Sequence, residues 1–402
     1  MNRKIRHTFL FILFLLTSLF FAPLFAQPTV QPWWLSLEQG KQKFRSGDYG
    51  SALMLFEDAR RQRWAMYDQM EKDIINFLSV REVRRLGDAL DWIERYSNER
   101  HYIAASAALE ELFYRVPKTE LNNSASAALE AIGKLKDYPE AEYWIGETYL
   151  AEGELSLALA QFRKAYSMRE LFENSGFEVE LQYKIAAVLK TRQEYNEMER
   201  SLHSIINNFD TLWSNADKFE IGKLEAGDGE NGRIKPVPYS EASASFALQA
   251  MTKTMENDGI DNFFTLFRYN NVKVERAHRL LGFYYVVSGR PSAQQHLTFA
   301  FLIQNTIIME EIKRRQFDFT FTNLSKLSEE IRKSAVLSSY AQETEYYKTA
   351  YYLGASLYRS GNTSVARNFW AFLAGLPEAG EWRERAIVQL RSPQMEPIVE
   401  MP

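Results

Sequence analysis

The side chains that most often carry out catalysis are not arranged in a catalytic pattern in this sequence. Four histidines follow residue 26, and none has the H-x-x-x-H or H-E-x-x-H spacing that places two imidazoles on one helix face for zinc. The sequence also has no G-x-S-x-G segment around a serine nucleophile and no P-loop lysine motif. We therefore expect the histidines to be surface or half-buried residues of helices. They are His101, His203, His278 and His296.

One glycine pattern has the spacing of a phosphate-binding loop without its context. Gly227, Gly229 and Gly232 form G-x-G-x-x-G. Such a loop needs a helix N-terminus after it, whereas Pro236 and Pro238 would block a helix, and nearby acidic residues would repel a phosphate. The same acidic segment lacks the ligand order of an EF-hand calcium loop. We expect a flexible turn here and no bound nucleotide or metal.

Composition removes further classes of function. The chain has no cysteine, which excludes disulfides, cysteine-ligated zinc, iron–sulfur clusters, thiol nucleophiles and a lipid attached to an N-terminal cysteine. With 48 Lys plus Arg against 52 Asp plus Glu, the net charge of −4 provides no electrostatic reason to expect nucleic-acid binding. Paired acids such as Glu310 and Glu311 are most simply explained as solvated helix faces. We expect no cofactor and no enzymatic activity.

The N-terminus has the three-part pattern of a secretory signal peptide. Arg3, Lys4 and Arg6 precede an apolar run, and the segment ends in small residues up to Ala26. Residues 1–26 are therefore predicted to direct export, to the periplasm or cell envelope of a bacterium or into the medium. Because Leu24 is larger than the residue preferred before a cleavage site, an uncleaved membrane anchor remains an alternative. No other segment is long and apolar enough to span a membrane.

Further along the chain, one pattern of six residues at fixed spacing occurs three times. The first copy, in residues 34–59, has Gly40, Phe44, Gly47, Ala52, Phe56 and Ala59. The second, in residues 143–165, has Gly146, Leu150, Gly153, Ala158, Phe162 and Ala165 at the same offsets. The third, in residues 352–373, has Gly354, Tyr358, Gly361, Ala366, Trp370 and Leu373. Weaker copies are found around Ala105, Ala186 and Gly282.

This spacing predicts a pair of antiparallel helices. A small residue followed by an aromatic or leucine lies on one face of a first helix, and the small residue allows a second helix to approach closely. A glycine followed by a polar residue then ends the first helix, and an apolar stripe follows on the second. The pattern resembles the tetratricopeptide repeat family, a helix–turn–helix unit of about 34 residues. The resemblance implies an all-α solenoid, in which the first helices line a concave groove that binds a protein or peptide.

The predicted domain organisation follows from one interruption. Residues 209–239 carry four glycines and two prolines, which predicts a loop or β-hairpin insert. It separates an N-terminal helical array, residues 27–208, from a C-terminal array, residues 240–391, and residues 392–402 form a tail. A basic run at Arg60, Arg61 and Arg63 is expected to mark a helix C-terminus, where positive charge is favourable.

The resemblance also implies which residues face the groove. Carried onto the three strong copies, the groove positions comprise Trp34, Leu37, Lys41, Arg45, Glu140, Tyr143, Glu147, Lys348, Tyr351 and Arg359. Glu147 stands where family members that clamp a C-terminal carboxylate have asparagine, so capture of such a tail is not expected.

We therefore expect an exported, non-enzymatic scaffold that binds a protein or peptide. Two alternatives remain open at this point. The chain could be a structural subunit of a cell-envelope assembly, in which the repeats make permanent contacts. It could also carry an enzyme such as a cell-wall hydrolase, although residues 209–239 offer no paired acid and base.

Overall fold

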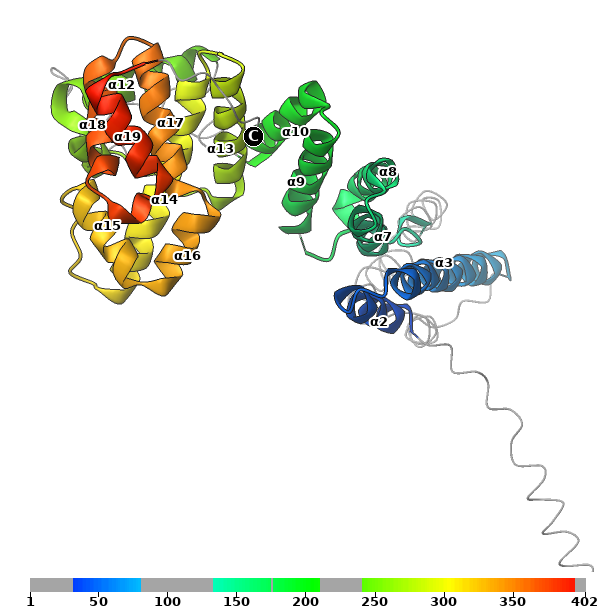
Figure 1. Cartoon of the computed structure of the whole chain (residues 1–402). Helices are drawn as coiled ribbons and strands as arrows, with labels where there is room; N and C mark the ends of the chain where they lie inside the picture. Colours follow the sequence, from blue (N-terminus) through cyan, green and yellow to red (C-terminus); the bar gives the residue numbers. More distant parts are fainter. Residues whose placement is uncertain (1–31, 81–132, 175, 210–240, 395–402) are drawn as a thin grey trace, which may run out of the picture. The chain divides into compact units, whose positions relative to one another are not determined.

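The computed structural model describes residues 32–80, 133–174, 176–209 and 241–394. Within these ranges the protein is helical and has no strand (Figure 1). The expectation of an all-α chain built from adjacent helix pairs is therefore confirmed for the described residues. The predicted signal peptide, His101, nearly all of the predicted insert and most of the predicted tail lie outside these residues.

The chain divides into two compact units, residues 1–175 and residues 176–402. The first unit contains α2 (Trp33–Arg45), α3 (Tyr49–Val80), α7 (Pro139–Ala151), α8 (Leu155–Ser167) and a short 3-10 segment, η2 (Arg169–Leu171). Helix α2 packs against α3, α7 packs against α8, and α3 also packs against α7 (Figure 1). The basic run that was expected at a helix C-terminus lies inside α3, because this helix continues to Val80.

The second unit contains ten helices in the described residues, together with a short 3-10 segment. They are α9 (Gly176–Thr191), α10 (Tyr195–Phe209), α12 (Glu241–Leu266), α13 (Val272–Val287), α14 (Ala293–Arg315), α15 (Leu324–Lys333), α16 (Ala335–Glu343), α17 (Tyr346–Arg359), α18 (Thr363–Ala374), η4 (Pro377–Ala379) and α19 (Glu381–Arg391). The pairs are α9 with α10, α13 with α14, and α17 with α18 (Figure 1). Helix α10 also packs on α13, α14 packs on α17, and α19 packs on α18.

The observed division differs from the boundary that the sequence suggested near residue 208. The pair α9–α10 was assigned to the N-terminal array, but it falls in the second compact unit. The reason is contact between helices on the two sides of the predicted insert, because α10 packs on α13. A change in composition along the chain therefore did not mark the boundary between packed units.

The five helix pairs of the described residues are joined by the same turn. At Gly47, Gly153, Gly289 and Gly361 the backbone has a positive φ, and the next residue donates its N–H to a carbonyl five residues earlier. For example, the N–H of Asp48 donates to the carbonyl of Lys43. This closure satisfies carbonyls at the end of the first helix, and glycine adopts it without a Cβ clash. The α9–α10 turn has the same closure with Gln193 at φ 61° instead of glycine.

The small residues of the pattern allow close helix approach, as predicted. A Cβ added at Gly40 would lie 2.5 Å from Phe56 Cε1, and one added at Gly146 would lie 2.6 Å from Phe162 Cδ1. Phe56 and Phe162 are fully buried. The aromatic ring of the second helix therefore packs directly on the glycine of the first.

None of the described helices is both long enough and apolar enough to cross a membrane.

Candidate functional site

The predicted groove residues of the first unit are divided between surface and core. Trp34 and Arg45 are exposed, whereas Leu37 and Tyr143 are buried. Lys41 is partly buried, and its Nζ lies 2.6 Å from Glu38 Oε1. The exposed residues are therefore available to a partner, while the buried ones pack their own helices.

Two predicted acidic groove residues of this unit are also shielded from solvent. Glu140 is buried and its Oε1 accepts a hydrogen bond of 2.8 Å from the backbone N–H of Glu173. Burial raises the pKa of Glu140, although that hydrogen bond and the charge of Arg63 work against the rise. Glu147 is partly buried.

In the second unit, Lys348, Tyr351 and Arg359 lie on α17 in three different environments. Tyr351 is fully buried, and its hydroxyl accepts a hydrogen bond of 3.4 Å from Gln389 Nε2. Lys348 is partly buried and its Nζ lies 2.9 Å from Glu345 Oε1. Arg359 is exposed, and one of its guanidinium nitrogens donates to the carbonyl of Val286 over 3.4 Å.

One predicted groove position is buried in each of the five pairs. It stands three residues before the small residue of the first helix and is occupied by Leu37, Tyr143, Tyr183, Arg279 and Tyr351, each of which is buried. A side chain at this position therefore packs between neighbouring helices. Contact with a partner must depend on the other positions of the first helices.

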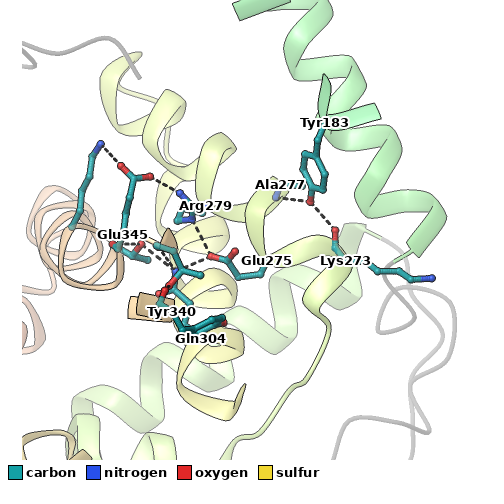
Figure 2. A network of polar contacts seen from close by, with 11 residues as sticks. Tyr183, Lys273, Glu275, Ala277, Arg279, Gln304, Tyr340 and Glu345 are labelled. Atoms are coloured by element: carbon teal, nitrogen blue, oxygen red, sulfur yellow. Dashed lines mark hydrogen bonds and ion pairs between the residues drawn. The ribbon is translucent and has the colours of Figure 1, made fainter. Parts of the chain in front are cut away.

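Tyr183 shows how this position joins one pair to the next. Its hydroxyl donates to the carbonyl of Lys273 over 2.7 Å and accepts from the N–H of Ala277 over 3.0 Å (Figure 2). The exposed Arg276 places its guanidinium 4.8 Å from the centre of the Tyr183 ring. This contact keeps a cation of α13 beside α9.

A buried polar network joins α13 to α14 and α17 (Figure 2). Arg279 Nε donates to Glu275 Oε1 over 3.0 Å, and the same guanidinium also donates to Glu345. Gln304 on α14 donates to Glu275 over 2.7 Å. Burial raises the pKa of Glu275, against the opposing effect of Arg279. Arg279 thus holds two carboxylates from two different pairs.

Glu345 is the partly buried end of this network. It precedes α17 with a φ of 49°, an uncommon conformation for a residue other than glycine. Burial acts to raise the pKa of Glu345, but Lys348 and Arg279 outweigh this effect and the net pKa lies below its usual value. The strained backbone is held by charge contacts to both neighbouring helices.

Lys190 on α9 is a cation to which this network provides neither a hydrogen bond nor an ion pair. Its side chain is partly buried and has no hydrogen-bond or ion-pair partner among the described residues. Burial lowers its pKa, nearby Lys348 lowers it further, and Glu345 acts in the opposite direction. A negatively charged or carbonyl group of a partner would relieve this unfavourable environment.

These helices therefore present one surface in the second unit, which we name the first-helix face. It is formed by α9, α13 and α17 and carries Lys190, Arg276, Lys348 and Arg359. Its acidic residues include Glu180 and Glu345. The arrangement provides hydrogen-bond donors for carboxylates and backbone carbonyls.

The histidines were expected to be surface or half-buried residues, and this is wrong for His278 and His296, which are buried. These two meet a third histidine. His203 on α10, His278 on α13 and His296 on α14 have ring centres within 6 Å of at least one other member of the group. Among the described residues, no group of three or more histidine or acidic side chains is placed to hold a metal ion. No spacing along the chain could have indicated this cluster, because the three residues belong to three helices of two different pairs.

Comparison with known proteins provides two distant relatives. An uncharacterized protein of Treponema pallidum is 22% identical over 363 residues, which cover 89% of both chains. An uncharacterized protein of Borreliella burgdorferi is 24% identical over 247 residues, covering 61% of this chain and 74% of the relative. No family model matches the sequence. The similarity therefore extends over nearly the whole chain in one case, without assigning an activity.

Proposed function

We propose that this protein is an exported, non-enzymatic scaffold that binds a protein or peptide along the first helices of its helix pairs. The proposal includes a superhelical solenoid of tetratricopeptide type, with residues 1–26 as the export signal. The observation that carries it is the first-helix face of the second unit. There, three consecutive first helices are tied together by side-chain contacts and still leave cations available.

The residues of this face differ in how much of their side chains is already engaged by neighbouring helices. Tyr183, Arg279 and Tyr351 are used for packing, so they give the face a rigid base. Arg276 and Arg359 remain exposed, and Lys190 is without a partner among the described residues. A prearranged set of donors on rigid helices loses little side-chain entropy when it binds an extended chain. Such a surface favours partners that present carbonyl or carboxylate groups.

The proposal can be tested by site-specific cross-linking in the cells that make the protein. A photoreactive residue at Arg276, on the first-helix face, should form an adduct with a defined partner. The same residue at Arg200, which is exposed on the second helix α10, serves as the matched control and should not form this adduct. Arg276→Glu should weaken capture at least tenfold, whereas Arg200→Glu should leave it unchanged. Equal adducts from both positions would contradict the assignment of the face.

A structural subunit of a cell-envelope assembly is the second candidate, and exposed apolar side chains favour it. In the first unit Trp34, Met54 and Trp64 are 42%, 62% and 51% exposed. In the second, Phe317 is 92% exposed. Large apolar side chains at the surface are typical of protein contact sites when they form a patch.

Sedimentation distinguishes the two candidates. A permanent subunit should associate with itself or co-purify in fixed stoichiometry at micromolar concentration. A scaffold that binds a transient partner should sediment as a monomer under the same conditions. Trp64→Ser would then dissociate the assembly in the first case and change nothing in the second.

A further inference from the structure

Three histidines connect the α9–α10 pair to the α13–α14 pair in the second unit. The ring centres of His278 and His296 are 5.1 Å apart, and those of His203 and His296 are 5.6 Å apart. His278 is fully buried and His296 is 7% exposed. His203 is half-buried and lines a hollow of about 610 Å³ on the polar side of α10. Protons from solvent can therefore reach the edge of the cluster.

The contact between the two buried rings limits how much charge they can carry. Nδ1 of His278 lies 3.0 Å from Nδ1 of His296. A hydrogen bond between these atoms requires one hydrogen, so one nitrogen donates and the other accepts. If both rings were imidazolium, two hydrogens would point at each other. In this geometry the pair can hold at most one positive charge.

The carboxylates near the cluster are already engaged. On α10, Glu199 Oε1 accepts from the hydroxyl of Tyr285 over 2.6 Å and from Arg290 over 2.7 Å. His203 Nε2 is 2.8 Å from the hydroxyl of Tyr285 and 4.0 Å from Glu199 Oε1.

Behind the pair, on α13, Glu275 acts on His278 but is bonded to Arg279. On α14, His296 is acted on by the charges of His278 and His203. Added positive charge would therefore be compensated only in part.

We propose that this cluster is a pH-sensitive latch, which holds α10 on α13 and α14 while His203 and His296 are neutral and releases the α9–α10 pair when acid pH charges them. The helix contact that would open is the packing of α10 on α13. Because α9 carries Tyr183 and Lys190, release would also take apart the first-helix face. The latch would exist whether or not that face binds a partner.

The sign of the effect follows from the environment of the rings. Burial, together with His278 and His203, lowers the pKa of His296 well below its usual range. Burial also lowers the pKa of His203, although Glu199 opposes the shift. In the released state the rings are solvated and their pKa is about 6.5. At pH values below about 6.5, the released state therefore binds more protons than the latched state. The latched state therefore loses stability as the pH falls below that value.

The expected size of the effect can be stated as a change in population. Consider a histidine that stays neutral in the latched state and has a pKa of about 6.5 in the released state. Lowering the pH from 7.5 to 5.5 then raises the equilibrium constant for release about tenfold. Two such histidines would give about a hundredfold. The loss of packing must be confined to the contact of the α9–α10 pair with the α13–α14 pair, since α17 and α18 do not contribute to the cluster.

Hydrogen exchange measured by mass spectrometry on the purified protein tests the latch. After correction for intrinsic rates, the amides of α10 should exchange at least about tenfold faster at pH 5.5 than at pH 7.5. Those of α18 should keep their protection and act as the internal control. His296→Asn places an amide near the position of Nδ1 and cannot titrate, so it should reduce the acid-induced change in α10.

Several outcomes would overturn the proposal. The latch is refuted if α10 is equally protected at both pH values, or if α18 opens to the same extent as α10. Should His296→Asn fail to fold at pH 7.5, His203→Asn at the solvent edge serves instead, because it removes one titrating ring without creating a buried gap. Acid release of α10 that is unchanged in the folded variant would show that other groups cause it.

Discussion

Both units bury an arginine in the core, and the two are held in different ways. In the first unit, Arg63 of α3 is fully buried among aromatic rings. Its guanidinium carbon lies 4.5 Å from the centre of the Tyr138 ring and 4.9 Å from that of Trp33. Its Nε donates to the carbonyl of Leu135 over 2.9 Å, but the two terminal nitrogens have no hydrogen-bond partner among the described residues.

In the second unit, Arg279 is 6% exposed and is held by carboxylates instead of rings. It donates to Glu275 on its own helix and to Glu345 before α17 (Figure 2). The comparison shows two ways to place a cation between helices. Aromatic faces stabilise the charge of Arg63, and no carboxylate among the described residues accepts a hydrogen bond from it. The carboxylates beside Arg279, in contrast, would lose their compensation if it were removed.

The largest predicted effect is the loss of Arg279. Arg279→Met would leave the buried Glu275 without its cation, which costs about 3–5 kcal/mol when one partner of a buried pair is removed. Arg63→Met would replace the guanidinium with an apolar group of similar length among aromatic rings, at a cost of at most about 2 kcal/mol. Urea unfolding of the two variants, followed by circular dichroism, measures the difference.

The double variant Arg279→Met with Glu275→Gln provides the control. Removing the orphaned carboxylate should recover part of the stability that Arg279→Met loses, because the remaining amide can be satisfied by Gln304. Equal losses for Arg63→Met and Arg279→Met would show that the aromatic and ionic environments stabilise a buried arginine in equivalent ways, and would contradict this prediction.

A smaller effect distinguishes the two pairs of the first unit from the α17–α18 pair of the second, through the space around the glycine of each first helix. Gly40→Ala and Gly146→Ala would force a Cβ to within 2.5–2.6 Å of a buried phenylalanine ring, and overpacking of this kind costs about 1–3 kcal/mol. At Gly354 in the second unit the closest atom, Trp370 Nε1, would be 3.0 Å away. We expect Gly354→Ala to cost less than half as much in thermal unfolding. A larger loss at Gly354 would show that Trp370 cannot move.

The sequence allowed the helix pairs to be predicted because their signals are local. Gly47 and Gly153 end first helices through a backbone conformation that glycine favours, so their role could be inferred from residue type. The α9–α10 turn has the same geometry with Gln193, and residue type could not indicate it. Local patterns therefore indicated the turns of the strong copies, whereas the turn of the weaker α9–α10 copy could not be inferred from residue type.

The candidate site depended on contacts between pairs, which the sequence does not encode locally. Tyr351 was expected to face a partner, but α19 covers it and Gln389 donates to its hydroxyl. Arg63 was expected near a helix end, yet α3 continues and places it among aromatic rings. The histidine cluster requires side chains from three helices to converge. Periodicity identifies the face of a helix, whereas the neighbouring pair decides how much of that face stays exposed.

The smallest predicted effect concerns the pH response of the first unit, through Glu140. Burial raises the pKa of this carboxyl in the folded state above its value of about 4.3 in an unfolded chain. The folded state therefore binds the proton more tightly, and stability rises as the pH falls through the raised pKa towards about 4.3. The gain is at most about 1.4 kcal/mol for each unit of the shift.

Glu140→Gln should remove this contribution and stabilise the first unit slightly at neutral pH, because a neutral amide replaces a partly desolvated charge. In this variant, the hydrogen-exchange rates of the α7 amides, corrected for intrinsic rates, should no longer vary with pH between 4.5 and 7. Acid pH would then act on the two units in opposite directions: it strengthens α7 in the first through Glu140 and loosens α10 in the second through the histidines. If α7 of the wild type loses protection on acidification, other carboxylates of the first unit, such as Asp68 with its lowered pKa beside Lys136, outweigh Glu140.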